Sequence, residues 1–398
     1  MSFNRVWRLA LLTAFAFAGG ARVARAGDDP MVEYAKFQAA AKSNDEAATL
    51  LHIRRAYTQA EKVWGARERR TAIFATSYAD HIVKKTDFPK ARDLFARCSE
   101  ILLGLGEGVT TERAYCQLRE ADVAAQMKEI EAAITALEQA IETLEKLSAV
   151  GDRYTKALLA SAYVAFANLL SFVEEEKEAN SVPASEREKD NLLNSARYAA
   201  KAEALLQEIS GSKSAEVASI FVLQGSIAER LEEWESAAEF YEAALPAYHE
   251  KFGLHLPASK SIELRAKRAR AIFEITASGG DLTNASKSGR MPSSPECLFN
   301  VRADREELEI CPVNRPAPIY PQAALSMWEE GFVVVEYDIA AGGMTENVRV
   351  VDSWPAFMFN SSATDAVKSW TFNPPSTKSG TIQRANQLKS LVRFEIAD

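Results

Sequence analysis

The chain has 398 residues, more than one compact hydrophobic core usually contains, so we expect two domains of unequal size. Hydrophobic residues make up 47% and charged residues 26%, which is ordinary for a globular protein and excludes a disordered chain or a collagen-like fibre. The formal net charge is −8, and an acidic surface disfavours nucleic acid and anionic lipid as partners.

Residues 1–26 have the pattern of a secretory signal peptide. Two arginines precede the apolar stretch Leu9 to Ala21, and Ala24-Arg25-Ala26 presents small residues where a signal peptidase cuts. We expect a mature periplasmic chain that begins at Gly27, with 43 basic and 55 acidic side chains and a net charge of −12. The alternative is a retained inner-membrane anchor facing the periplasm, although the apolar stretch is shorter than the roughly 20 residues that span a bilayer. We find no other stretch long and apolar enough to cross a membrane.

Four cysteines in an exported chain can form disulfides. Proximity in sequence favours the pairs Cys98–Cys116 and Cys297–Cys311, and four buried free thiols are the alternative. No CxxC motif and no Cys/His metal spacing occur, so we expect no zinc site and no other metal.

Residues 31–275 predict a domain of amphipathic helices. They are rich in Ala, Glu, Leu and Lys, and apolar residues recur at spacings of three and four. A last helix, Ser259 to Ile275, would cap the stack. Breaks between helices are expected at Gly104–Gly106, Gly151–Asp152, Asn180–Ser185 and Gly253–Pro257.

The segment Ala218 to Tyr248 resembles a tetratricopeptide repeat, in which small and aromatic residues stand at fixed packing positions. Those residues here are Gly225, Ala237, Tyr241 and Ala244, and earlier copies align as Ala91, Phe95 and Cys98, as Ala133, Leu137 and Ala140, and as Ala196 and Ala200. The charged segment 174–190 is interpreted as an insertion or a long loop. The resemblance implies an α-solenoid whose concave surface binds a protein or peptide, and the alternative is a spacer.

Composition changes after Ile275. Residues 276–318 are rich in Gly, Ser, Asn and Pro and predict a linker. Tyr320-Pro321 then predicts the start of a short helix with Ala323, Ala324, Met327 and Trp328 inward. We expect Glu330-Gly331 to end it, with glycine in a left-handed turn.

The remainder of the domain 319–398 alternates strand and helix patterns. Residues 332–339 predict a strand, Gly342-Gly343 a hairpin turn, and residues 347–352 a returning strand. The residues expected to face the core are Val333, Val335, Tyr337 and Ile339, then Val348 and Val350, then Ala363, Ala366, Val367 and Trp370 of a second helix, and finally Leu388, Val392, Phe394 and Ile396 of a last strand.

The C-terminal 80 residues resemble the C-terminal domain of the TonB family. The motifs that carry the resemblance are Tyr320-Pro321 with Ala324, Glu330-Gly331, Gly343, Asn347-Val348, Val350-Val351 and Trp370-Thr371-Phe372-Asn373-Pro374. The resemblance implies a three-stranded antiparallel sheet with two helices on one face, and capture of an extended peptide from an outer-membrane transporter at the sheet edge. The partner-binding residues it implies are Tyr320, Pro321, Leu388, Ser390, Val392 and Phe394, which could instead only cap the helix and complete the core.

We therefore expect a periplasmic adaptor with two domains, an α-solenoid followed by a TonB-like α+β domain. The alternatives are an energy transducer with a retained anchor and a structural protein that forms a homodimer through its last strand. We expect no enzymatic activity and no cofactor, because no nucleophile motif, phosphate loop or dinucleotide fingerprint occurs. The histidines His52, His81, His249 and His255 have no metal-binding spacing.

Overall fold

The structure is a computed structural model that describes residues 29–148, 151–172, 184–254, 256–277, 298–303, 306–377 and 379–396. The chain divides into two compact units, Met1–Leu158 and Leu159–Asp398, and each is described by itself. The expected signal peptide, Cys297, His255 and much of the charged segment 174–190 lie outside the described residues.

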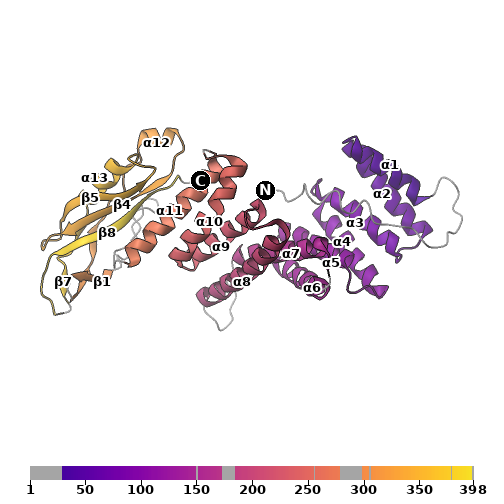
Figure 1. The fold of residues 1–398 in the computed structure, drawn as a ribbon, viewed down its shortest axis with the longest axis horizontal. Helices are drawn as coiled ribbons and strands as arrows, with labels where there is room; N and C mark the ends of the chain where they lie inside the picture. The colour runs from indigo at the N-terminus through magenta and orange to yellow at the C-terminus, as the bar shows by residue number, and fades with distance from the viewer. Residues whose placement is uncertain are drawn as a thin grey trace. The chain divides into compact units, whose positions relative to one another are not determined.

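The first unit consists of helices in which sequence neighbours pack together. Short polar turns separate them, and side chains cap their starts: Asp45 accepts a hydrogen bond from the Ala48 N–H and Thr110 accepts one from the Arg113 N–H. The helices are α1 (Pro30–Lys42), α2 (Glu46–Val63), α3 (Arg69–Val83), α4 (Phe88–Gly104), α5 (Thr111–Gln126) and α6 (Ile130–Ser148) (Figure 1).

A disulfide joins two neighbouring helices of this unit. Cys98 of α4 and Cys116 of α5 are bonded, with their Cα atoms 6.1 Å apart, as proximity in sequence predicted. Both sulfur atoms lie in a buried cluster with Ala72, Ile101 and Leu102. Cys311 is also disulfide-bonded, so free thiols are wrong for three of the four cysteines.

The second unit contains the later helices, and α7 crosses the division between the units. The repeat predicted over Ala218 to Tyr248 is confirmed. A Cβ at Gly225 would lie 2.7 Å from the ring of Tyr241, so only glycine allows this close packing. Ala237, Tyr241 and Ala244 are fully buried. The helices are α7 (Arg153–Phe172), α8 (Ala184–Ser210), α9 (Ala215–Arg230), α10 (Trp234–Phe252) and α11 (Pro257–Ala277).

The repeat alignment on α8 is wrong by one residue. Ser195 and Ala199 are buried, whereas Ala200 is exposed and Ala196 is only half-buried. Adjacent small residues in this helix leave the buried face undecided in the sequence. With Ser195 as the reference, the step to Ala237 becomes 42 residues, equal to the step from Ala91 to Ala133.

The prediction that no later stretch could cross a membrane is wrong for α7. An 18-residue window of this 20-residue helix has a mean hydropathy of 1.3, and half of that window is buried inside the protein. Alanines distributed along the helix raise the mean hydropathy without producing a run of large apolar side chains. A buried helix of a repeat passes the same test of length and composition.

The C-terminal part of the second unit contains the predicted three-stranded antiparallel sheet. Its strands are β4 (Gly331–Ile339), β5 (Thr345–Trp354) and β8 (Ala385–Phe394), in the order β5-β4-β8. Helix α13 (Asn360–Lys368) covers one face, and α12 (Gln322–Ser326) lies at the end where β4 begins. The face beneath α13 is the core of the domain.

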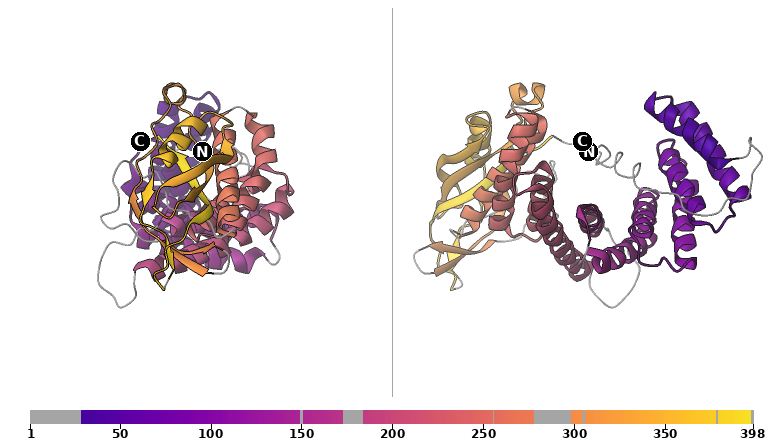
Figure 2. Two further views of the ribbon diagram at one scale, coloured as in Figure 1. Left: turned by 90° about the vertical axis from the view of Figure 1, so that its left-hand side faces the viewer. Right: turned by 45° about the vertical axis from the view of Figure 1, so that its right-hand side comes forward.

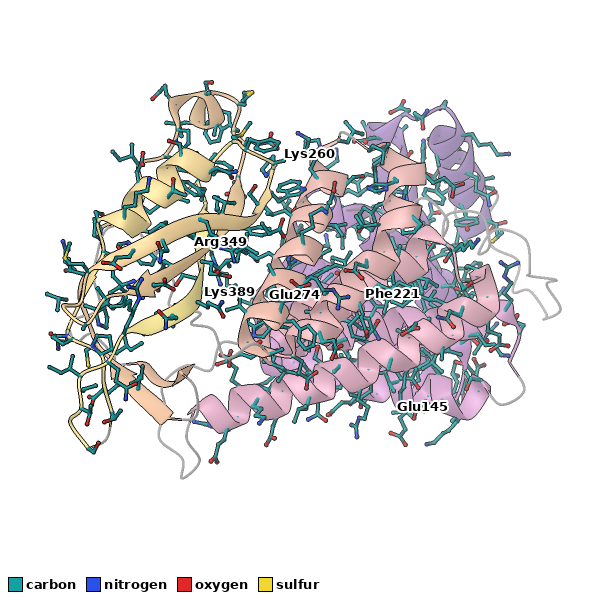
Figure 3. All side chains as sticks on the ribbon, turned by 60° about the vertical axis from the view of Figure 1, so that its left-hand side comes forward. Glu145, Phe221, Lys260, Glu274, Arg349 and Lys389 are labelled. Atoms are coloured by element: carbon teal, nitrogen blue, oxygen red, sulfur yellow. A yellow bond between two sulfur atoms is a disulfide. The ribbon has the colours of Figure 1, made fainter. Side chains whose placement is uncertain are left out.

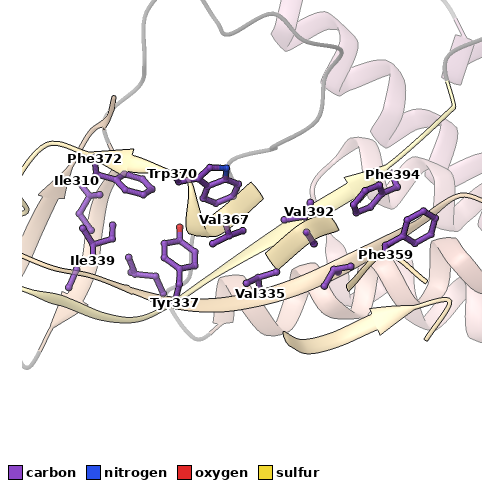
Figure 4. Close-up of a cluster of buried hydrophobic side chains, with 14 of the residues drawn as sticks. Ile310, Val335, Tyr337, Ile339, Phe359, Val367, Trp370, Phe372, Val392 and Phe394 are labelled. Carbon is purple, nitrogen blue, oxygen red and sulfur yellow. The ribbon is translucent and has the colours of Figure 1, made fainter. Parts of the chain in front are cut away.

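Aromatic side chains dominate this core. The ring centroids of Phe359 and Phe394 are 4.4 Å apart and stacked, and Trp370 meets Tyr337 edge to face. Figure 4 shows two groups along the sheet, Tyr337, Trp370 and Phe372 with Ile310 and Ile339 at one end, and Phe359 with Phe394 at the other.

The segment expected to be a linker, 276–318, contains strands. Leu308 and Ile310 alternate with Glu307 and Glu309, which puts both apolar side chains into the core. The additional strands are β1 (Leu298–Ala303), β2 (Glu306–Ile310) and β7 (Ser376–Thr377) in one small sheet, and β3 (Pro312–Asn314) with β6 (Thr371–Phe372) in another.

The short helix α12 is less buried than predicted. Four side chains were expected to point inward: Ala323, Ala324, Met327 and Trp328. Only Ala324 is buried, because a helix of five residues is long enough to place just one side chain against the sheet. The left-handed conformation expected at Gly331 occurs at Trp328, whose φ is 52°. Gly331 instead begins β4, where a Cβ would lie 2.2 Å from the Trp354 carbonyl oxygen.

Helix α11 covers the second face of the sheet. Ala271, Ile272 and Ile275 of this helix form a buried cluster with Phe332, Val334 and Leu391 of the sheet. The sheet therefore lies between α13 and α11 (Figures 1 and 2). The cap predicted for the end of the repeats is thus itself covered by the C-terminal domain.

Candidate functional site

Strand β8 is one edge of the three-stranded sheet. It pairs along its length with β4, from Gly331 opposite Phe394 to Ile339 opposite Ala385. No second ladder on β8 occurs among the described strands, although β1 comes close to it. An edge strand presents alternate backbone N–H and C=O groups without ladder partners, and these can pair with another extended chain.

The predicted site residues on β8 all point into the core. Leu388, Ser390, Val392 and Phe394 are at most 3% exposed. The Ser390 hydroxyl lies 3.1 Å from the Tyr337 hydroxyl. These residues can offer a partner their backbone groups, but their side chains are enclosed.

Tyr320 and Pro321 hold the start of α12 against the end of β8. The Tyr320 hydroxyl donates a 2.6 Å hydrogen bond to the Glu329 carbonyl oxygen, and its ring meets the ring of Phe394 edge to face. Partial burial, together with the nearby charges of Glu330 and Glu329, raises the pKa of Tyr320 to about 12, so the hydroxyl stays protonated at neutral pH. Pro321 is the residue before the first turn of α12.

The opposite face of β8 was not predicted as part of the site. Leu391 on this face is buried against α11, while Lys389 and Arg393 remain partly exposed. Figure 3 shows Lys389 on the sheet and Glu274 on α11. The alternation of these residues is visible in the sequence, and the unbroken apolar run Phe332 to Val335 of β4 was the signal that could have indicated a covered second face.

Charged side chains join the repeats to this face. Glu229 of α9 is largely buried and pairs with Arg265 and Arg268 of α11. Arg268 also pairs with Glu395, which follows β8, at 3.1 Å. Burial, and then the charge of Arg268, lowers the pKa of Arg393. Two arginines from different parts of the chain, Arg393 of β8 and Arg268 of α11, therefore lie along this edge strand, and we call them its basic margin.

The described part of the chain has no cluster of metal-ligating side chains. No group of three or more His, Cys, Asp or Glu side chains there could hold a metal ion. A hollow of about 570 Å³ lies between α11 and the end of β5, where Lys260 is paired with Glu329. Its lining includes Trp354 and Pro355 but no cysteine or histidine.

Comparison with known proteins agrees with this geometry. A family model described as the Gram-negative bacterial TonB protein C-terminal matches residues 316–396. The C-terminal domain matches the TonB C-terminal family. Protein TonB of Escherichia coli strain K12 is 31% identical over 70 residues, which are 18% of this chain and 29% of that protein. Protein TonB of Klebsiella aerogenes is 35% identical over 60 residues, 15% of this chain and 25% of that protein. The match thus spans less than a third of these TonB proteins.

Two solved structures are similar to different parts of the chain. The solution structure of the Pseudomonas aeruginosa TonB C-terminal domain has 26% identity and a TM-score of 0.21, covering 25% of this chain and 96% of that one. The TPR-like repeats of a Podosopora anserina putative kinesin light chain have 10% identity and a TM-score of 0.43, covering 57% of this chain and 99% of that one.

Proposed function

We propose that this protein is a periplasmic adaptor that binds an extended segment of an envelope protein at the β8 edge of its TonB-type domain. The observation that carries the proposal is the open edge of β8. Its core-facing side chains are buried, so the strand is held firmly while its outer backbone groups stay available for pairing. This role requires no catalytic residue.

The partner class follows from the family resemblance. We propose an extended peptide of an outer-membrane transporter as the ligand of β8, with the helical repeats as a second protein-binding surface. The domain boundaries proposed from the sequence, 31–275 and 319–398, assign one surface to each part.

Hydrogen–deuterium exchange tests strand addition directly. Synthetic peptides covering the N-terminal extensions of the source organism's outer-membrane transporters are added to the full chain, and amide exchange is followed. Strand addition protects the amides of β8 while those of β5, the opposite edge, stay unchanged. Protection of neither strand by any of these peptides would contradict the proposal.

A proline substitution gives the complementary test. Val392→Pro in β8 removes a backbone donor and disturbs the edge, and we expect peptide binding to be lost. Val351→Pro in β5 is the matched control at the other edge and should retain binding. Val392 is buried, so a proline there could abolish binding by unfolding the domain. Both variants must therefore still show the thermal unfolding transition of the folded domain.

Export and oligomeric state separate the alternatives. An intact mass that begins at Gly27 in the periplasmic fraction supports the adaptor, whereas a full-length chain in the inner membrane supports a transducer. A dimer in sedimentation experiments that Val392→Pro dissociates would favour the structural role, because β8 would then pair with its own copy.

A further inference from the structure

We propose that the β8 edge selects a carboxylate in its partner, because Arg393 of the edge strand and Arg268 of the last repeat helix together form a basic margin beside it. The inference rests on strand addition at β8 as proposed above. It adds what the added strand must carry: an Asp or Glu on the side that faces α11.

The first step is the direction of the side chains. Successive residues of β8 alternate between the core and α11, and the buried cluster that Leu391 forms with residues of α11 identifies the α11 side. Arg393 and Lys389 lie on the same side as Leu391. Residues of an added strand that point to this side would have Cβ atoms roughly 5 Å from their neighbours on β8.

The second step is the local balance of charge. Three arginines, Arg265, Arg268 and Arg393, share two carboxylates, Glu229 and Glu395. Glu229 already accepts from Arg265 and Arg268, and Arg268 also holds Glu395. The cluster thus has one more positive charge than negative charge, and this excess lies next to the open edge.

The third step is the incomplete hydrogen bonding of Arg393. Its Nε is buried and has no hydrogen-bond partner among the described residues. Its charge is disfavoured by burial and by the neighbouring Arg268, which lower its pKa. A carboxylate on the added strand would supply the missing negative charge beside this partly exposed side chain.

The overall charge of the chain disfavours the acidic peptide that the local charges favour. The full sequence has a net charge of −8, so long-range electrostatics oppose the binding of an acidic peptide. A preference for Glu over its neutral isostere must therefore come from local pairing at the edge.

The test uses labelled nine-residue peptides of alternating Val and Ser, in which one Ser is replaced by Glu or by Gln at each position in turn. Binding to the full chain is measured by fluorescence anisotropy at fixed salt. For the best position we expect the Glu peptide to bind at least about fivefold more tightly than the Gln peptide. Arg393→Gln should abolish this ratio, because it removes the charge that distinguishes a Glu peptide from a Gln peptide.

Two further variants control the result. Lys368→Gln on α13 removes the same charge from an exposed position of the same domain and should retain the ratio. Arg393→Lys keeps the positive charge and should retain part of the preference for the Glu peptide. Equal binding of Glu and Gln peptides by the unmodified chain overturns the carboxylate preference alone, whereas binding of neither overturns strand addition as well.

Discussion

Asp338 joins three strands at one point of the sheet. Its carboxylate accepts hydrogen bonds from the Asn347 side chain at 2.6 Å, from the Gln387 backbone N–H at 2.8 Å and from Arg384 at 3.1 Å. Asn347 and Gln387 both have positive φ, and the pairings of β4 with β5 and with β8 shift register beside Asp338. One side chain therefore stabilises two unusual backbone positions.

Replacing Asp338 by Asn should destabilise the domain by about 1–3 kcal/mol at pH 7, because charged acceptors form the stronger hydrogen bonds. Partial burial raises the pKa of Asp338, but its hydrogen bonds and the charge of Arg384 outweigh burial and leave the pKa below its ordinary value. The stabilisation is thus present at neutral pH and is lost as the pH falls below about 4. Urea unfolding at pH 7 and pH 3 should show the difference between variant and parent shrinking at pH 3. A difference that does not depend on pH would contradict this role.

Gly331 occupies a position where any side chain collides with backbone. A Cβ there would lie 2.2 Å from the Trp354 carbonyl oxygen and 2.6 Å from the Phe359 ring. Gly331→Ala should therefore lower the free energy of unfolding by at least about 1–3 kcal/mol. Gly342→Ala is the control, since its Cβ would meet nothing within 4 Å. Thermal unfolding that changes equally in both variants would refute the steric argument.

At the scale of elements, the disulfide fixes α4 against α5. Cys98 and Cys116 are 18 residues apart, and closing a loop of that size stabilises a fold by about 3 kcal/mol in the chain-entropy model. Reduction should lower the melting temperature of the first unit, and the double variant Cys98→Ala with Cys116→Ala should show no further change in that transition. If reductant does not change the melting temperature of the first unit in the parent protein, helix packing alone stabilises this unit and the disulfide adds nothing.

Element type could be predicted from sequence more reliably than the faces that elements bury. The strand at 332–339, the turn at Gly343 and the repeat around Tyr241 follow from local patterns that the structure confirms. The covered second face of the sheet was missed, although the unbroken apolar run Phe332 to Val335 is typical of a strand buried on both sides. Trp328 was wrongly predicted to point inward. Whether it is buried depends on where α12 ends, and the hydrophobic character of the residue does not indicate that.

At the scale of the whole molecule, the C-terminal domain depends on α11 for part of its burial. A fragment of residues 296–398, which keeps β1, β2 and β3 but lacks α11, would expose Phe332, Val334 and Leu391, which are at most 4% exposed in the full chain. We expect this fragment to bind a hydrophobic dye and to aggregate, and Leu391→Lys to reduce both effects. Dye fluorescence and light scattering provide the measurements. A fragment that remains monomeric without binding dye would show that α11 is dispensable.

The two faces of α11 also limit how this chain can be recombined. Ile262 and Ala266 pack toward α10, and Ile272 and Ile275 pack on the sheet. One residue inserted between these groups would turn the second face by about 100° relative to the first, because an α-helix has 3.6 residues per turn. A gene fusion that transfers the C-terminal domain to another protein must therefore transfer this helix as well, in its original length.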